Sequence, residues 1–483
     1  MNAQGPRGET SMREVSLRSK IAIFSVGLLT FLGILTETSL TVAFPILMKQ
    51  FNASLDSVQW LTSGYLLMVT VVMCSTAYLN ERFPAQAMFR FAVVTCFCGS
   101  LLCALAPNLA LLMAGRLLQA MATGVATPLM YHLIFELVPL HRLGFYVGLA
   151  AMVVSLAPAL GPVYGGILTN FISWRMIFWI LVPLIAVLAL VGFRYVILPA
   201  SKNPRRFDAI GLALLAVSML GLIEVVNQWG RMGIANWGFA IRLVITFTAL
   251  ALLVVHAIKG KRQIINFHLL ARSIVRLRAA NYFIFQFANI GISVILPLFS
   301  QKYLGTSALV AGLIMLPGSI AGAFISPFAG KTYDKHGPRI TITLGNVSMM
   351  VGCALLCWFT KSSTVLTLTL LYMFIRIGFN TGFGSTMSDA TKRVAPAEKG
   401  DVNTMFNTFQ QYAGSLGTSV LAAAITAFEG RTSSVNANAA VASGTQLDFL
   451  MLTVLAFFGL IFTLMTYRLD SPKAKPVIKK VQG

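Results

Sequence analysis

Long apolar stretches recur along the whole chain and are separated by short polar segments. A helix that crosses a membrane needs about 20 consecutive, mostly apolar residues. Fourteen stretches meet this requirement, and we expect each to form a membrane-spanning helix. They lie at residues 21–46, 60–79, 88–106, 110–137, 145–168, 176–197, 209–227, 239–258, 282–304, 308–330, 340–359, 365–387, 404–428 and 449–467. The pattern predicts an all-α polytopic membrane protein.

Basic residues are spread unevenly over the segments between these stretches. If the N-terminus is cytoplasmic, the segments on that side carry most of the lysines and arginines. The segments on the other side carry only Lys49, Arg175, Arg231, Arg242, Lys302, Lys361 and Arg431. This is the positive-inside pattern, and with an even number of helices it predicts that both termini are cytoplasmic.

The stretches form a group of six, a pair and a second group of six. Because the pair adds an even number of crossings, both groups of six begin on the same side of the membrane. Two parallel halves around a central pathway require this arrangement. The predicted parts are a cytoplasmic N-terminal segment (1–20), a six-helix bundle (21–197), a linker with two extra helices and a basic cytoplasmic loop (198–281), a second six-helix bundle (282–467) and a basic cytoplasmic tail (468–483).

Composition excludes several other classes of protein. Charged residues make up 11% of the chain, against about 25% in soluble proteins. The net charge of +22 lies in short loops, which argues against a nucleic-acid-binding face. Six cysteines sit in apolar stretches without a CxxC pair, so we expect neither disulfides nor a metal site. The chain has no phosphate-binding GxxxxGK[ST] loop and no loop large enough for a catalytic domain, so we do not expect an enzyme.

A few acidic residues lie inside the apolar stretches, namely Glu37, Glu136 and Glu224. Glu37 is well inside the first stretch, where Thr30, Gly33, Glu37 and Thr41 share one helix face. Burial favours the neutral form of a carboxyl group, because it removes the water that solvates the charge. Glu37 can therefore hold a proton and release it when a substrate arrives, which makes it the candidate coupling residue. The alternative is a structural glutamate bonded to a neighbouring helix.

Two arginines also lie deep in apolar stretches, Arg116 and Arg376. Such an arginine costs about 2.5–3.5 kcal/mol on insertion scales, so it usually faces a partner or water. Arg116 shares a helix face with Gln119 and Thr123, which suggests a cavity and a role beside Glu37. The alternative is a structural arginine bonded to carbonyl groups of a neighbouring helix. The two arginines outnumber Glu37, which raises the possibility of an anionic substrate.

Polar side chains at helical spacing mark further faces that should meet protein or a water-filled route rather than lipid. The candidate substrate contacts are Thr41, Gln119, Thr123, Gln286, Asn289, Arg376, Asn407 and Gln411. Interhelical hydrogen bonding is the alternative for each of them.

The stretch 145–168 is rich in glycine and proline. Its motif residues are Gly148, Pro158, Gly161, Pro162, Gly165 and Gly166. Glycine lets helices approach closely and proline bends a helix, so this stretch is suited to act as a pivot.

Two polar loops complete the set of motifs. The loop after 308–330 holds Gly330, Asp334, Lys335, Gly337 and Arg339, and the loop after 60–79 keeps the acid–base pair Glu81 and Arg82.

Together these motifs resemble those of the major facilitator superfamily, and within it the fourteen-helix drug:proton antiporters, over nearly the whole chain. The segment 161–166 resembles the antiporter motif, 116–119 the Arg-x-x-Gln motif, and 330–339 the cytoplasmic loop motif, which implies a latch made of charge pairs. Aligned on Pro45, the acid of the family pattern falls on Thr36, so Glu37 is displaced by one residue, about 100° around a helix.

The resemblance implies a proton-coupled transporter that exports amphipathic compounds by alternating access. It implies no cofactor besides the coupling proton, and small-molecule substrates, protons and the lipid bilayer as partners. We expect a monomer in a bacterial plasma membrane. Two alternatives stay open, a dedicated exporter of an anionic metabolite or lipid, and a membrane sensor or scaffold that does not transport.

Overall fold

The computed structural model describes residues 15–199, 208–232, 236–259, 267–395, 398–429 and 437–470, and all regular structure among them is helical. Helices satisfy their backbone hydrogen bonds within one segment, as a lipid environment demands. The first part of the chain forms α1 (Leu17–Ser39), η1 (Leu40–Ala43), α2 (Phe44–Gln50), α3 (Leu55–Val58), α4 (Trp60–Arg82), α5 (Ala85–Leu105), α6 (Leu109–Leu137), α7 (Leu140–Phe171), α8 (Met176–Trp179) and α9 (Leu181–Tyr195).

The rest of the chain continues this pattern. It forms α10 (Ala209–Met232), α11 (Trp237–Lys259), η2 (Phe267–Ala271), α12 (Ser273–Lys302), α13 (Ala308–His336), α14 (Pro338–Phe359), η3 (Thr360–Ser362), α15 (Val365–Lys392), α16 (Lys399–Glu429) and α17 (Ala437–Leu469). Most of the predicted N-terminal segment and basic tail lies outside the described residues.

Each of the fourteen predicted stretches coincides with a long helix or with consecutive shorter ones. Twelve spans among the described residues are long and apolar enough to cross a membrane. The other two predicted crossings correspond to α7 and α16, which are 32 and 31 residues long. The prediction of an all-α membrane fold is therefore confirmed.

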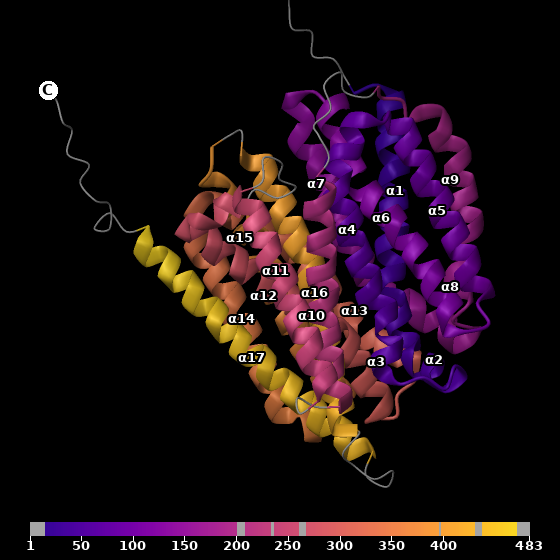
Figure 1. The fold of residues 1–483 in the computed structure, drawn as a ribbon, viewed down its shortest axis with the longest axis vertical. Coiled ribbons are helices and arrows are strands. Elements are labelled where there is room, and N and C mark those ends of the chain that lie inside the picture. Colours follow the sequence, from indigo (N-terminus) through magenta and orange to yellow (C-terminus); the bar gives the residue numbers. More distant parts are fainter. Residues whose placement is uncertain are drawn as a thin grey trace, which may run out of the picture.

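Figure 1 shows two groups of helices, with α1 to α9 on one side and α12 to α17 on the other. We call them the N bundle and the C bundle. They meet along two seams, where α7 packs on α13 and α4 packs on α16. Helix α10 also packs on α16 and α4, so the inserted pair α10 and α11 lies along the second seam.

The largest apolar cluster that the two bundles share lies at one end. We call the end where α1 begins and α17 ends the terminus end, and the opposite end the far end. At the far end, one apolar cluster joins Phe44 and Phe178 of the N bundle to Ile295 and Phe299 of the C bundle. The cluster near the terminus end of the N bundle, which runs from Val15 to Val196, contains no described residue of the C bundle. The bundles are thus packed together at the far end, and a further apolar cluster joins Leu67 and Cys74 of α4 to α10, α12, α15 and α16 along the second seam.

The glycines of α7 allow close approach on both of its faces. A Cβ atom on Gly165 would lie 2.0 Å from the backbone oxygen of Ser39, and one on Gly161 would lie 1.9 Å from Oγ1 of Thr38. On the C-bundle side, a Cβ atom on Gly166 would lie 2.7 Å from the carbonyl oxygen of Ala308. Real Cβ atoms do not come this close, so α1 and α13 can touch α7 only because these side chains are absent.

We expect Gly165→Leu to separate α1 from α7 and to prevent stable folding, because the new side chain would collide with the backbone of α1. Overpacking of this kind costs about 1–3 kcal/mol or more. The matched control is Gly384→Ala in α15, where no atom lies within 4 Å of the new Cβ. Thermal unfolding of both detergent-solubilised variants checks this, and an unchanged midpoint for Gly165→Leu would contradict it.

Candidate functional site

Glu37 lies near the far end of α1, three residues before the helix tightens into η1. It is 5% exposed, and its carboxyl group makes no hydrogen bond to another described residue. Its neighbours in sequence, Thr38 and Ser39, face α7 at the glycine contacts. The structure therefore does not support the alternative of a glutamate bonded to a neighbouring helix, as far as the described residues go.

Arg116 is fully buried in α6 and belongs to a network that ties four helices together. Its Nε donates to the carbonyl oxygen of Leu61 in α4 at 3.3 Å, and Nη1 donates to Oε1 of Gln119 at 3.0 Å. Gln119 in turn donates to Ser100 of α5 at 2.9 Å. The carbonyl bond is the feature expected of a structural arginine. Nη2, however, is buried without a hydrogen-bond partner among the described residues, so part of the guanidinium is unsatisfied.

Tyr65 of α4 completes this network, although no sequence pattern distinguishes it from the other tyrosines. Its ring lies under the guanidinium of Arg116, with 4.1 Å between Cζ and the ring centroid. Its hydroxyl donates to the carbonyl oxygen of Gly33 in α1 at 3.0 Å and lies 2.7 Å from Oγ1 of Thr123. The Glu37 carboxyl group is close enough to both Arg116 and Tyr65 to interact with them electrostatically. The structure thus brings together Glu37, Arg116, Gln119 and Thr123, as the sequence predicted.

A second polar group lies in the C bundle. Arg376 of α15 donates from Nη1 to Oδ1 of Asn289 in α12, and Asn289 donates to Oε1 of Gln286 at 3.4 Å. The Arg376 side chain is 7% exposed, and its Nε has no hydrogen-bond partner among the described residues. Three of the predicted substrate contacts therefore form one cluster.

An aromatic run extends from this cluster toward the terminus end. Arg376 lies 5.2 Å above the ring of Phe379, and Phe379 stacks on Phe383 at 4.6 Å. Phe383 stacks on Tyr282 at 4.1 Å, and the Tyr282 hydroxyl donates to Gln410 of α16 at 2.8 Å. Aromatic residues are too common in this chain for the sequence to single out these rings, and tertiary packing selects them.

The remaining predicted contacts lie apart from these groups. Thr41 is buried in η1 and donates to the carbonyl oxygen of Thr38 at 2.7 Å, which is a local role. Asn407 and Gln411 are half-buried on α16 and make no hydrogen bond to another described residue. They remain candidates without an assigned partner.

The predicted latch residues lie at the terminus end. Gly337 has a φ of 74° and forms the turn from α13 into α14, a conformation that favours glycine. Arg339 lies 5.7 Å from the ring centroid of Tyr467, and Arg82 contacts Tyr78. Lys335 and Gly330 are exposed. The side chains of Glu81 and Asp334, and the surroundings of Gly148, lie outside the described residues, so the latch stays a prediction.

Two acidic residues, Asp448 and Asp389, lie within helices of the C bundle although both fall outside the predicted apolar stretches. Helix α17 begins at Ala437, earlier than the predicted stretch 449–467, and so it includes Asp448. Asp448 is fully buried, and neither carboxyl oxygen has a partner among the described residues. Asp389 of α15 is also buried and pairs with Arg278 of α12 at 2.7 Å. The set of three acids named from the predicted stretches is therefore incomplete, because the polar start of α17 hid the helix boundary.

The α4–α16 seam near the far end holds a cluster of buried hydroxyl and amide groups. Ser63 of α4 contacts Thr418 and accepts from Ser419 at 2.9 Å, both of which lie on α16. Gln59, the residue before α4, accepts from Ser419 at 3.3 Å and donates to Asn227 of α10 at 3.2 Å. The inserted helix α10 is therefore hydrogen-bonded into the contact between the bundles.

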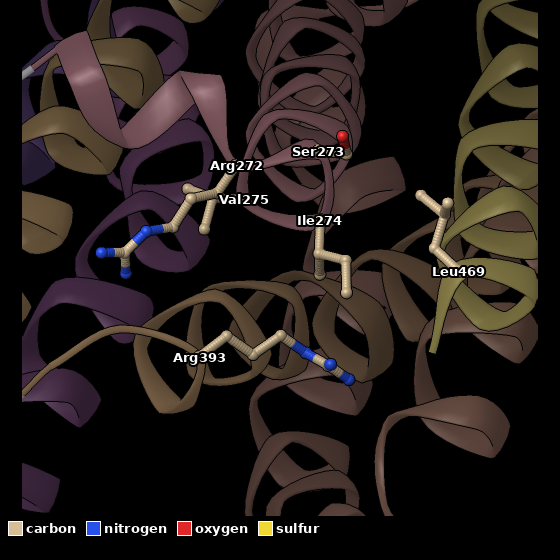
Figure 2. A pocket seen from close by; sticks show the side chains of 6 residues that line it. All are labelled: Arg272, Ser273, Ile274, Val275, Arg393 and Leu469. Atoms are coloured by element: carbon tan, nitrogen blue, oxygen red, sulfur yellow. The ribbon is translucent and has the colours of Figure 1, made fainter. Parts of the chain in front are cut away.

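A cavity of about 510 Å³ opens at the terminus end of the C bundle, lined by Arg272, Ser273, Ile274, Val275, Arg393 and Leu469 (Figure 2). Arg272 pairs with Glu398 at 2.9 Å, and Arg393 pairs with Asp470 at 2.8 Å. The hydrogen bonds to Asp470 raise the pKa of the Arg393 guanidinium. Since both arginines already have acidic partners, we do not regard this surface cavity as the functional site.

Comparison with known proteins places the chain among membrane transporters. Residues 26–418 match the family model of the Major Facilitator Superfamily. The lincomycin resistance protein LmrB of Listeria monocytogenes is 29% identical over 444 residues, which cover 90% of this chain and 94% of that protein. LmrB of Bacillus subtilis is 27% identical over 454 residues, with 91% and 94% covered. A solved bacterial homologue of the human lysosomal transporter Spinster, in an inward-facing and unoccupied conformation, shares the fold with a TM-score of 0.68 at 13% identity, covering 94% of this chain and 98% of that one.

We expect Asp448→Leu to raise the thermal stability of the protein, because it removes a buried polar group that has no described partner. An unsatisfied group of this kind costs about 1–3 kcal/mol. Asp448→Asn, which keeps the shape and a polar end, is the matched control and should leave stability close to wild type. Thermal unfolding of the detergent-solubilised variants measures the effect, and a lower midpoint for Asp448→Leu would contradict the prediction.

Proposed function

Because the chain belongs to the major facilitator superfamily, a family of multi-pass membrane transporters, we propose that it exports amphipathic compounds in exchange for protons. Two relatives that match about nine tenths of the chain are named as lincomycin resistance proteins, which supports export of toxic compounds. Proton antiport is the proposed source of energy, since the chain lacks a nucleotide-binding loop of the GxxxxGK[ST] kind. The coupling proton is the only cofactor we assign.

The proposed location is a bacterial plasma membrane, with a single chain as the working unit. The positive-inside distribution of loop charges supports cytoplasmic termini. The terminus end would then face the cytoplasm and the far end the exterior. Since the largest apolar cluster shared by the bundles lies at the far end, this structure would be closed to the exterior, and a substrate would enter from inside.

Glu37 is the proposed proton carrier, and its burial without a hydrogen-bond partner is the observation that carries this assignment. A carboxyl group with no other partner is available both to a proton and to a cationic group of the substrate. Arg116 is near enough to stabilise the ionised form after the proton has left. One carboxyl group that binds either ligand, but not both, is sufficient for exchange.

The glycine contacts of α7 support a link between this carboxyl group and the motion of the bundles. Thr38 and Ser39, next to Glu37, touch Gly161 and Gly165, while Gly166 touches α13 of the C bundle. A change in the α7–α13 seam would therefore be transmitted to α1 through a backbone contact. In the proposed cycle, proton binding at Glu37 and closure of the terminus end favour each other.

One observation favours the alternative of an anionic substrate. Arg376 carries a buried charge with no carboxylate partner among the described residues. A scaffold without transport activity would need neither this charge nor an unpartnered Glu37.

We expect Glu37→Gln to abolish proton-driven export, because the amide cannot take up or release a proton. In proteoliposomes with an imposed pH gradient, accumulation of an amphipathic dye should fall to the level of empty liposomes. Downhill movement of the dye should persist, since glutamine is nearly the same size as glutamate and leaves the helix packing intact.

Glu136→Gln is the matched control, because it makes the same change at an exposed acid of α6 and should leave uptake unchanged. Uphill transport by Glu37→Gln at the wild-type rate would rule out Glu37 as the coupling residue.

A further inference from the structure

Arg376 differs from the other deeply buried arginines because no acidic side chain among its described neighbours balances its charge. Arg278 pairs directly with Asp389 at 2.7 Å, and Arg116 interacts electrostatically with Glu37. Around Arg376 the described neighbours are neutral, with Asn289 and Gln286 on one side and the ring of Phe379 on the other. A buried cation is stable only if something compensates its lost hydration. The partner that is missing from the described protein can come from the substrate.

The free donor of Arg376 defines what that partner must offer. Guanidinium nitrogens only donate hydrogen bonds, so the ligand must present an oxygen or another acceptor. One face of the guanidinium already lies over Phe379, and Nη1 is held by Asn289, which leaves Nε without a partner. The side chain is thus held in place by its neighbours before any ligand arrives.

The aromatic run beside Arg376 supplies an apolar surface for the same ligand. Phe379, Phe383 and Tyr282 stack in succession toward the terminus end, the direction of entry in the proposed cycle. Phe383 is only half-buried. Gly384, the next residue, is exposed and has no atom within 4 Å of its missing side chain, so there is open space next to α15 at this level.

Antiport requires that substrate binding weaken proton binding, and this requirement excludes a substrate that is only anionic. Binding effects are reciprocal, so an anion beside a protonated Glu37 would strengthen proton binding, and the proton would strengthen anion binding. Such a pair moves together, whereas antiport requires competition. The group that approaches Glu37 must therefore be cationic, while the group that approaches Arg376 must be an acceptor.

The depths of the two residues set the minimum length of such a molecule. Gln301 of α12 donates to the carbonyl oxygen of Val42 at 3.0 Å, which places these two residues at the same level. Asn289 lies twelve residues from Gln301, or about 18 Å along α12, and Glu37 lies five residues from Val42, or about 8 Å along α1 and η1. Arg376, held by Asn289, is therefore about 10 Å closer to the terminus end than Glu37.

From this arrangement we infer that the transported compounds are bipolar amphiphiles, with a cationic amine that competes with the proton at Glu37 and an oxygen acceptor, at least about 10 Å away, that binds Arg376 beside the Phe379–Phe383–Tyr282 surface. The inference rests on the proposed proton antiport and specifies its substrate class.

The test uses full-length protein in proteoliposomes and a matched pair of probes. The first is a tertiary amine joined by an alkyl chain to a phenyl ring that bears a carboxamide, and the second has a methyl group in place of the carboxamide. We expect wild type to bind the carboxamide about tenfold more tightly, since a hydrogen bond to a charged donor distinguishes the two. Arg376→Gln should reduce this ratio to about one and leave the affinity for the methyl probe nearly unchanged.

Two further variants make the result specific. Asn289→Asp places a carboxylate against Arg376 and should abolish the preference for the carboxamide while the arginine remains. Arg276→Gln removes an exposed positive charge near the terminus end of α12 and should preserve the preference. Equal binding of both probes by wild type, or an unchanged ratio in both Arg376→Gln and Asn289→Asp, would overturn the inference.

The same liposomes separate this inference from the proposed antiport. Both amine probes should drive proton release through the wild-type protein, and neither should drive it through Glu37→Gln. If neither probe moves protons through wild type, the antiport proposal fails. If the methyl and carboxamide probes move protons equally well and bind equally well, antiport stands and only the role of Arg376 is refuted. A carboxylate probe without an amine should not drive proton exchange, and exchange driven by that probe would also overturn the inference.

Discussion

Close contact between the backbones of α1, α7 and α13 is the constraint on which the rest of the structure depends. Gly161 and Gly165 let α1 approach α7 without a side chain between them, and Gly166 does the same for α13. Contacts of this kind leave no room for adjustment, because backbone atoms cannot move aside as a flexible side chain can. The position of Glu37, one residue before Thr38, is thereby fixed relative to the seam between the two bundles. A carrier that couples proton binding to bundle motion needs such a rigid connection.

The buried charged side chains differ in how far an opposite charge compensates them. The fully paired ones suit a structural role, and the others include those to which we assign a function. Arg278 and Asp389 form a direct ion pair near the terminus end of the C bundle, which suits a structural role. Arg116 and Glu37 interact without a direct ion pair, so the carboxyl group remains available. Arg376 and Asp448 have no oppositely charged partner among the described residues. Since burying an uncompensated charge is costly, sites of this kind deserve a functional test before a structural explanation is accepted.

The seam between α4 and α16 is closed by hydroxyl and amide groups rather than by ion pairs. Each such hydrogen bond contributes about 0.5–1.5 kcal/mol, so several together can hold the far end closed and still be broken one after another. Asn227 brings α10 into this cluster through Gln59. The inserted pair of helices is therefore part of the contact between the bundles, in addition to being the connection between them.

The sequence by itself determined the helical membrane fold, the approximate position of every long helix and the family, because apolar length, loop charge and glycine spacing are properties of local segments. It also selected Glu37, Arg116, Gln119 and Thr123, which share two helix faces and meet in the structure. Only the tertiary structure decided that Tyr65 joins them, that Phe379, Phe383 and Tyr282 line the approach to Arg376, and that Asp448 lies inside a helix. The direction of Glu37 could not be counted from Pro45, because the intervening η1 turns more per residue than an α-helix. Contacts between helices that are far apart in the chain depend on how those helices cross, and no periodicity within one segment records that.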